Sequence, residues 1–423
     1  MDIVFRNVKV IQQESPFNGQ TIDIFIQNGI ISQIGSNLKV DVAQEINLDG
    51  ACVSAGWIDF QVQSGEPGFE YKEDLRSLCE TALDGGFTSV VLMPDGQPCM
   101  DNKAAVDMVA KRTEFSPLQV LPAAALSKGM KGEELSEMYD LHLAGCVAYT
   151  DNAHPIKNSK LVLLAGQYAH SFQKPILITS MDAYLAKGAS VNEGPEAVNL
   201  GMKGIPTIAE DVAVQRDVAI AQYADVPVHF LNVTSVDSIE IIHQNKLKGA
   251  RLSTSLAAHY LHFSDQELKK FDTNYKVFPP LRSEDERKTL KQCVKDGKID
   301  VLCSNHIPED RETKIIEFEK GAFGTLGLQT FFGSVYTCLK DDCTLEQIVA
   351  TFTSNPRKIL GLTIPLIKEG EKAELSFFNT NVEWEFTLDK NKSKSENSAY
   401  WGVKLQGKPI GVYTNNTWVK SNL

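Results

Sequence analysis

Residues 212–255 read VAVQRDVAIAQYADVPVHFLNVTSVDSIEIIHQNKLKGARLSTS, and this stretch decides the fold. Helical periodicity over 212–223 gives way to an apolar strand pattern over 226–233, and the two patterns repeat over 236–245 and 251–255. Strands that alternate with helices pair in parallel, because each helical crossover returns the chain to the same end of the sheet. The stretch therefore predicts two successive units of an α/β protein.

The alternation continues on both sides of this stretch, from about residue 53 to residue 356. Eight segments are strand candidates, near 57–62, 88–93, 118–124, 146–150, 176–180, 228–233, 251–255 and 300–304. Eight strand–helix units in roughly 300 residues fit a closed (β/α)8 barrel of the TIM type. A doubly wound open sheet is the alternative, but no G-x-G-x-x-G motif follows the first strand to support it.

The two ends of the chain differ from this middle segment. Short strand patterns fill the first fifty residues and include an Asn28-Gly29 hairpin signal, and strand patterns return at 373–378 and 418–419. We therefore expect both ends to fold together into one small β-sandwich domain. The expected segments are residues 1–52, the barrel at 53–360, and residues 361–423.

Composition excludes several classes of function. The net charge is −12 and no long Lys/Arg block is present, which disfavours a nucleic-acid partner. No apolar run approaches the roughly 18–20 residues that cross a membrane, and the N-terminus lacks a secretory pattern. The eight cysteines form no C-x-x-C pair. We expect a cytoplasmic protein with reduced thiols.

Local signals place some helix boundaries. Residues 71–83 have a helical pattern that ends at Gly85-Gly86. Two segments fit capping boxes, each of which opens a helix: Ser264-Asp265-Gln266-Glu267 and Ser283-Glu284-Asp285-Glu286.

Several short stretches along the chain together carry a family resemblance. They include Glu66-Pro67-Gly68, Gly85-Gly86-Phe87-Thr88, Pro279-Pro280-Leu281-Arg282, Phe323-Gly324-Thr325-Leu326-Gly327-Leu328 and Ser354-Asn355-Pro356. On these motifs the chain resembles dihydroorotases of the amidohydrolase superfamily over nearly its whole length. The resemblance implies a (β/α)8 barrel with a β-sandwich built from both termini, and zinc-dependent hydrolysis of a cyclic amide.

The residues at the implied zinc site depart from the family pattern. The family signature Asp-x-His-x-His-x-Arg reads Asp-Phe-Gln-Val-Gln-Ser-Gly at 59–65, so two zinc-binding histidines and a substrate-binding arginine are replaced. The ligand-position equivalents are Gln61, Gln63, Asp151, Thr179, Asn232 and Asn305. Only Asp151 is a usual zinc ligand, because amide and hydroxyl oxygens are poor substitutes for imidazole or carboxylate. Asn305 stands at the implied general-base position and cannot accept a proton as a carboxylate does.

The implied substrate contacts also differ. Gly65 replaces the arginine, Phe278 replaces an asparagine, and Asp95 and Glu309 replace an asparagine and a histidine. The two carboxylates would repel an anionic substrate such as dihydroorotate. We therefore expect no catalytic residue, no bound metal and no cofactor, although the family uses zinc.

Two functional hypotheses remain. The first, implied by the resemblance, is a non-catalytic homologue in pyrimidine biosynthesis that assembles with aspartate carbamoyltransferase, as a homodimer or larger assembly. The alternative is a cyclic-amide hydrolase with metal-free or single-metal chemistry, based on Asp95, Asp151 and Glu309. His306, with Glu309 and Asp151, is the candidate set for a single metal.

Overall fold

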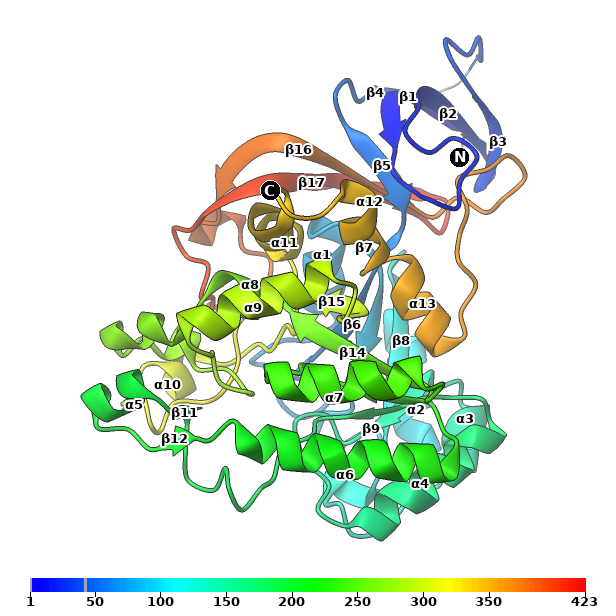
Figure 1. The fold of residues 1–423 in the computed structure, drawn as a ribbon. Helices are drawn as coiled ribbons and strands as arrows, with labels where there is room; N and C mark the ends of the chain where they lie inside the picture. The colour runs from blue at the N-terminus through cyan, green and yellow to red at the C-terminus, as the bar shows by residue number, and fades with distance from the viewer. Residues whose placement is uncertain (1, 42–43) are drawn as a thin grey trace.

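Eight parallel strands form the centre of the molecule (Figure 1). The computed structural model describes residues 2–41 and 44–423. The barrel strands are β6 (Trp57–Val62), β7 (Phe87–Leu92), β8 (Gln119–Ala125), β9 (Ala148–Thr150), β10 (Ile176–Ile178), β13 (Val228–Phe230), β14 (Leu252–Ala257) and β15 (Val301–Cys303). Each overlaps one of the eight strands predicted from the sequence, and they pair in chain order. The predicted (β/α)8 barrel is therefore confirmed.

The first and last barrel strands approach each other and almost close the ring. Val62 and His306 form a parallel bridge, and the Gln63 N–H donates to the His306 carbonyl at 2.9 Å. The surrounding helices are α1 (Leu75–Asp84), α2 (Lys103–Thr113), α3 (Met138–Leu143), α4 (Ser159–Ser171), α6 (Ile208–Ala224), α7 (Val236–Leu247), α9 (Glu284–Lys295), α11 (Phe331–Leu339), α12 (Leu345–Ala350) and α13 (Ser354–Leu360). Because parallel strands all end on one side, their carboxyl ends define a single mouth.

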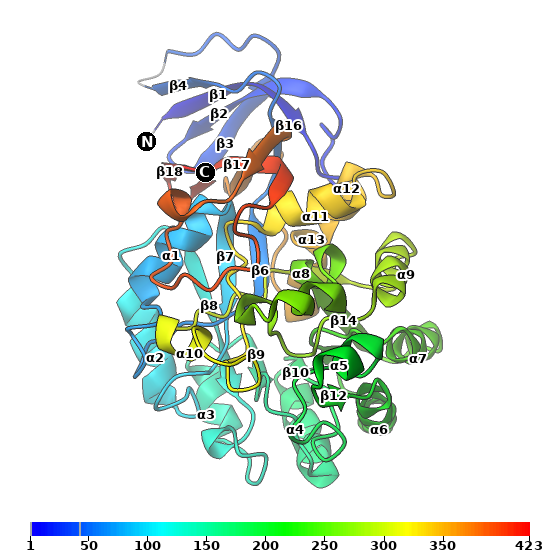
Figure 2. The same ribbon diagram turned by 90° about the vertical axis from the view of Figure 1, so that its left-hand side faces the viewer.

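Short elements lie on the mouth side of the barrel. The arrow of β14 points to the left in Figure 1, toward β11 (Val191–Asn192), α5 (Pro195–Leu200), β12 (Gly204–Ile205) and α10 (Arg311–Lys314). Figure 2 turns this side toward the viewer, with α10 and α5 in front of the strands. The 3-10 helices η2 (Asp265–Lys270) and η3 (Thr273–Tyr275) belong to the connection between α8 (Ala258–His262) and α9.

The two ends of the chain pair in a second sheet, as predicted. Its strands are β1 (Ile3–Val10), β2 (Thr21–Gln27), β3 (Ile30–Gly35), β4 (Gln44–Asn47), β5 (Cys52–Ala55), β16 (Leu375–Glu385), β17 (Lys404–Thr414) and β18 (Thr417–Lys420). Strand β5 joins the halves, because it pairs with β1 on one side and β16 on the other. Asn28 and Gly29 both have positive φ in the turn between β2 and β3, as a two-residue hairpin requires.

Two helix starts differ from the sequence-based expectation. The first helix begins at Leu75 rather than 71, because Asp74 accepts from the Ser77 N–H as the N-cap. Residues 264–267 form no capping box: Ser264 makes no side-chain cap bond, and a 3-10 helix follows it. The capping box between Ser283 and Glu286 is confirmed at the start of α9.

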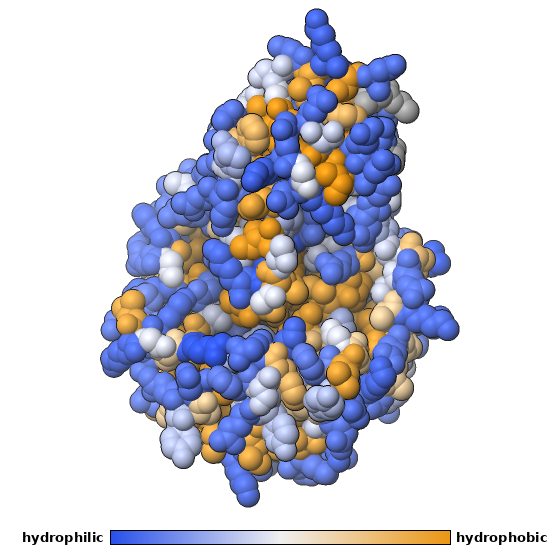
Figure 3. Space-filling view, turned by 90° about the vertical axis from the view of Figure 1, so that its right-hand side faces the viewer, coloured by the Kyte–Doolittle hydropathy of each residue, from blue (hydrophilic) through white to orange (hydrophobic). Residues whose placement is uncertain are grey.

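Polar side chains cover most of the face in Figure 3, with hydrophobic residues gathered near its centre below the terminal sheet. Among the described residues, every helix is too short or too polar to cross a membrane.

Candidate functional site at the barrel mouth

A chain of amide hydrogen bonds runs across the mouth of the barrel. The Asn232 amide donates to Gln61 Oε1 at 2.7 Å, and the Gln61 amide donates to Asn152 Oδ1 at 2.8 Å. The Asn152 amide then donates to Asp95 Oδ2 at 2.7 Å. Gln61, Asn152 and Asn232 are all at least 97% buried. The mouth thus holds a network in which three buried amides satisfy one another and end on the Asp95 carboxylate.

Backbone geometry places these side chains. Asn152, Asn232 and Asn305 follow β9, β13 and β15, and each has a φ near +50°, a conformation in which asparagine is favoured among non-glycine residues. Asp59 on β6 accepts from the Gln61 and Ser304 N–H groups, each at 3.0 Å. Complete burial raises the pKa of Asp59 to about 6, although these two hydrogen bonds act in the opposite direction.

The two aspartates of the mouth have separate partners. Asp151 accepts from the Ser127 N–H at 2.8 Å and from the Ser127 hydroxyl. Burial raises the pKa of Asp151 above its usual range. Burial also raises the pKa of Asp95 to about 6, while His154 and the Asn152 amide act in the opposite direction. The pKa of both Asp59 and Asp95 is raised to about 6, and of these two residues only Asp95 is partly exposed.

The other predicted ligand positions, Gln63, Thr179 and Asn305, follow the carboxyl ends of β6, β10 and β15. Thr179 is buried directly after β10, and Gln63 is half-buried after β6. Asn305 is 2% exposed, and its Oδ1 finds no hydrogen-bond partner among the described residues.

The backbone has closed around Gly65, where the resemblance implies an arginine. The Gly65 N–H donates to the Glu73 carbonyl at 2.8 Å, and its carbonyl accepts from the Phe69 N–H at 2.6 Å. A Cβ atom at Gly65 would lie 1.9 Å from the Phe69 carbonyl oxygen. Any side chain at position 65 therefore requires the loop to move, so an arginine cannot replace Gly65 without a rearrangement of the backbone.

The remaining substrate-position equivalents also have structural partners. The Phe278 and Phe323 rings meet edge to face at 5.7 Å, and Phe278 packs on the small cluster of Met181 and Ile205. Glu309 pairs with Lys72 at 2.7 Å. Phe278 is therefore held by apolar contacts, and Glu309 is held in an ion pair.

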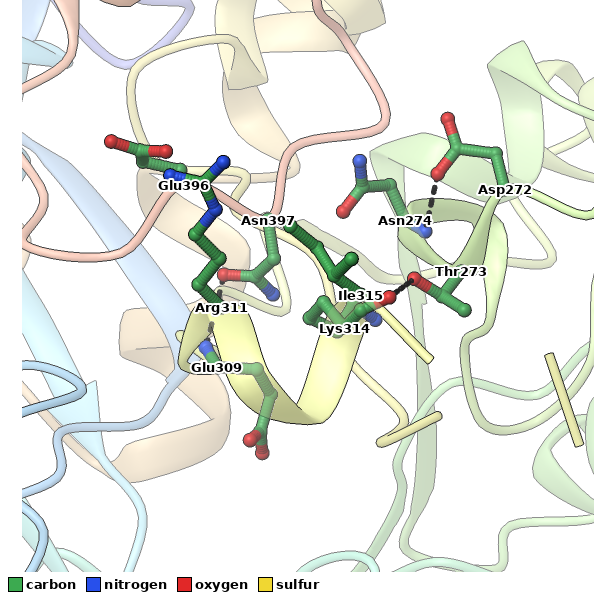
Figure 4. Close-up of a pocket in the computed structure, with 9 residues that line it drawn as sticks. All are labelled: Asp272, Thr273, Asn274, Glu309, Arg311, Lys314, Ile315, Glu396 and Asn397. Atoms are coloured by element: carbon green, nitrogen blue, oxygen red, sulfur yellow. Dashed lines mark hydrogen bonds between the residues drawn. The ribbon is translucent and has the colours of Figure 1, made fainter. Parts of the chain in front are cut away.

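A hollow of about 230 Å3 lies beside Glu309 (Figure 4). The Glu309 N–H donates to Asn397 at 2.9 Å, while its carboxylate points away from the other labelled side chains. Arg311 extends on the opposite side, toward Glu396.

Two further residues at the mouth, Asn152 and Glu73, were not predicted as site residues. Asn152 links Gln61 to Asp95, and its place directly after Asp151 at the end of a strand was the available signal. Buried Glu73 lies 3.4 Å from His306 Nε2 and also accepts from the Ser393 hydroxyl. The sequence around Glu73 or around His306 could not predict this contact, because 233 residues separate the two.

The donors at the mouth do not fit a zinc ion. Zinc sites use imidazole, thiolate or carboxylate, whereas Gln61 and Asn232 offer amides that already bind each other. His306, Asp151 and Glu309, the candidate set for a single metal, bind Glu73, Ser127 and Lys72 respectively. Within residues 2–41 and 44–423, no three His, Cys, Asp or Glu side chains are arranged to hold a metal ion.

Comparison with known sequences establishes the family. The profile described as Dihydro-orotase-like matches residues 50–238, and the one described as Amidohydrolase family matches residues 212–419. A dihydroorotase of Pelobacter propionicus is 34% identical over 97% of this chain and 98% of its own length. The chain belongs to the dihydroorotase family. A dihydroorotase of Acetivibrio thermocellus is 35% identical over 97% of both chains.

Solved structures agree on the fold of this dihydroorotase-family chain. An L-hydantoinase (dihydropyrimidinase) from Arthrobacter aurescens superposes with a TM-score of 0.87, at 20% identity, over 99% of this chain and 96% of its own. A D-hydantoinase gives a TM-score of 0.84, also at 20% identity, over 100% and 96%. At this identity the likeness concerns the amidohydrolase barrel and its accompanying sheet.

Proposed function

We propose that this member of the dihydroorotase family is a non-catalytic protein of pyrimidine biosynthesis, a structural or regulatory partner of aspartate carbamoyltransferase. The observation that carries the proposal is the hydrogen-bonded chain Asn232–Gln61–Asn152–Asp95 across the barrel mouth. In a zinc-dependent amide hydrolase the metal lowers the pKa of a bound water and polarises the amide carbonyl. Paired neutral amides supply neither effect.

The loss of acid–base groups supports the same proposal. Asn305, at the implied general-base position, is a neutral amide at every physiological pH and cannot take a proton from water. Gly65 leaves no cationic anchor for a substrate carboxylate, and the close approach of Phe69 prevents one from being fitted without rearrangement. Substrate anchoring and proton transfer are thus both unsupported.

The retention of the fold supports an assembly role. Relatives match over nearly the whole length of the chain, which supports retention of the barrel and the terminal sheet. A protein with an intact scaffold and no reaction centre acts through its surface. We also propose that it forms a homodimer or a larger assembly with its partner.

Two measurements test the proposal with the purified full chain. Dihydroorotate turnover, with and without added zinc, should stay at the rate of the buffer alone. Mixing with purified aspartate carbamoyltransferase of the same organism at micromolar concentration should give one earlier peak on a sizing column. Turnover at the rate of an ordinary dihydroorotase would contradict the lack of catalysis, and two separate peaks would contradict the partner.

One observation favours a second candidate, a cyclic-amide hydrolase with metal-free chemistry. The pKa of Asp95 is raised to about 6, which suits a general acid or base. Asp151 and Glu309, however, bind Ser127 and Lys72, and Asp151 acts on Asp95 only through its charge. Hydrolysis of any cyclic amide or imide by the wild type, lost in Asp95→Asn, would establish this candidate in place of the first.

A further inference from the structure

A groove on the mouth side of the barrel is lined mainly by hydrophobic residues. It lies between α5, the end of η2 and the segment after α10, and its volume is about 430 Å3. Its apolar lining comes from Leu200, Met202, Phe271, Ile316 and Phe318. Three separate segments of the chain therefore converge to build one apolar surface.

Two hydrophobic residues that line the groove are exposed. Phe271 is 51% exposed and Ile316 is 44% exposed. Single exposed hydrophobic residues are ordinary on a protein surface, but several around a shaped groove are typical of interaction sites.

The backbone at Phe271 gives an independent reason to assign a function to the groove. Its φ is +53°, a left-handed conformation that is costly for a bulky side chain. Most other non-glycine residues with positive φ in the described chain are asparagines, and Phe271 is the only aromatic one. Such strain persists mainly where the side chain has a role, and an exposed phenylalanine contributes little to the core.

The wall of the groove that Phe318 and Glu319 form is anchored by a buried lysine. Lys276 Nζ donates to the carbonyls of Phe318 and Glu319 at 2.9 and 2.7 Å. Lys314 Nζ donates to the carbonyls of Ala322 and Gly324, which follow this wall in the chain, at 2.9 and 2.8 Å. The wall is therefore organised before any partner binds, which reduces the entropic cost of association.

The charge of the groove selects its occupant. Its charged lining residues are Glu317 and Glu319, and no lysine or arginine side chain lines it within the described chain. Glu317 pairs with Lys320 at 2.6 Å, whereas Glu319 forms no ion pair with any described residue and interacts electrostatically with the buried Lys276. A second copy docked groove to groove would bring these acidic rims together, which is unfavourable. A partner that carries lysine or arginine beside the groove forms an ion pair with Glu319.

We infer that the groove receives a hydrophobic side chain, flanked by lysine or arginine, from a different protein. The inference rests on the proposed function, and it names the surface through which the assembly forms. Phe271 and Ile316 supply the apolar contact, and Glu319 supplies the charge that orients the partner.

The test measures the affinity of full-length variants for purified aspartate carbamoyltransferase by titration calorimetry. Phe271→Gly, Ile316→Ser and Glu319→Lys should each weaken binding by about tenfold or more. Tyr223→Ser on α6, where the tyrosine is 81% exposed, and Glu133→Lys in an exposed loop are matched controls that should stay within about twofold. Phe271→Gly should keep or raise the melting temperature, because glycine adopts positive φ without strain.

The outcomes separate this inference from the proposed function. If the wild type binds and all three groove variants bind equally well, the docking surface is elsewhere and the inference is overturned while the proposed function stands. If Phe271→Gly loses binding only by unfolding, Phe271 is structural and the inference is also overturned. If the wild type does not bind, the partner named in the proposed function is wrong, and the inference falls with it.

Discussion

The Asn232 amide donates to Gln61 Oε1 across the barrel mouth at 2.7 Å, although 171 residues separate them in the chain. Both stand at positions where the resemblance implies histidine ligands of zinc. The two buried amides thus form a hydrogen bond with each other. Among the described residues, no cluster of His, Cys, Asp or Glu is arranged to hold a metal ion. The contact explains how the barrel tolerates buried polar groups at its mouth.

Removal of the central amide should destabilise the fold. In Gln61→Leu, Asn152 loses a donor and Asn232 loses an acceptor inside a buried site. We expect the free energy of unfolding to fall by about 2–4 kcal/mol, measured in urea. Asn381→Ala, at an exposed position on β16, is the control and should change it by less than about 0.5 kcal/mol. Equal stability of Gln61→Leu and wild type would show that the network contributes nothing.

A methyl group at Gly65 should disrupt the loop between β6 and α1. The added Cβ would lie 1.9 Å from the Phe69 carbonyl oxygen, so the loop must open. We expect Gly65→Ala to lower the free energy of unfolding by about 1–3 kcal/mol in urea. Gly194→Ala is the control, because its nearest neighbour would lie 3.9 Å away and its extended backbone suits any residue. A wild-type result for Gly65→Ala would mean that the loop readily makes room.

The raised pKa of Asp95 should make stability depend on pH. Its folded pKa of about 6 exceeds the ordinary value of 3.8, so the folded state binds more protons between these values. Stability therefore falls as pH rises from about 4 to about 6, and Asp95→Asn removes this loss. Because Asp95 is partly exposed, we expect the variant to gain only about 1–2 kcal/mol over wild type at pH 7, and nothing at pH 4. Urea unfolding at four pH values measures the difference, and a constant difference would contradict the assigned pKa.

The buried ion pair between Arg282 and Glu210 should be a major structural anchor. The two side chains are 2.9 Å apart and almost completely buried, and Glu210 also accepts from Thr234 and Ser235. Arg282→Met leaves a buried charge without its cation and should cost about 3–5 kcal/mol. The exposed pair of Lys103 and Asp107 is the control, where Lys103→Ala should cost under about 1 kcal/mol. Thermal unfolding followed by circular dichroism compares both.

The strands of the barrel could be predicted because their signal is local. Each β strand is a short apolar run between helical patterns, so all eight were located from the sequence. The start of the first helix was placed four residues early, because the decisive signal was the Asp74 cap rather than the preceding aromatic pattern. Ser264 has the spacing of a capping box without forming one, since the following turn is a 3-10 helix.

The candidate site was only partly predictable. The sequence shows Gln61 and Asn232 at positions where the resemblance implies histidines, but their mutual hydrogen bond depends on barrel closure. The loop closure around Gly65 and the contact of Glu73 with His306 likewise join segments far apart in the chain. The sequence did not single out Phe271, because its positive φ and its place in the groove appear only in the folded structure.

Zinc content tests the central claim most directly. Full-length protein produced in zinc-supplemented medium, desalted and analysed by plasma mass spectrometry should carry fewer than about 0.1 zinc ions per chain, because paired amides do not hold this metal. One or more zinc ions per chain, lost in a variant at Asp151, would contradict the account.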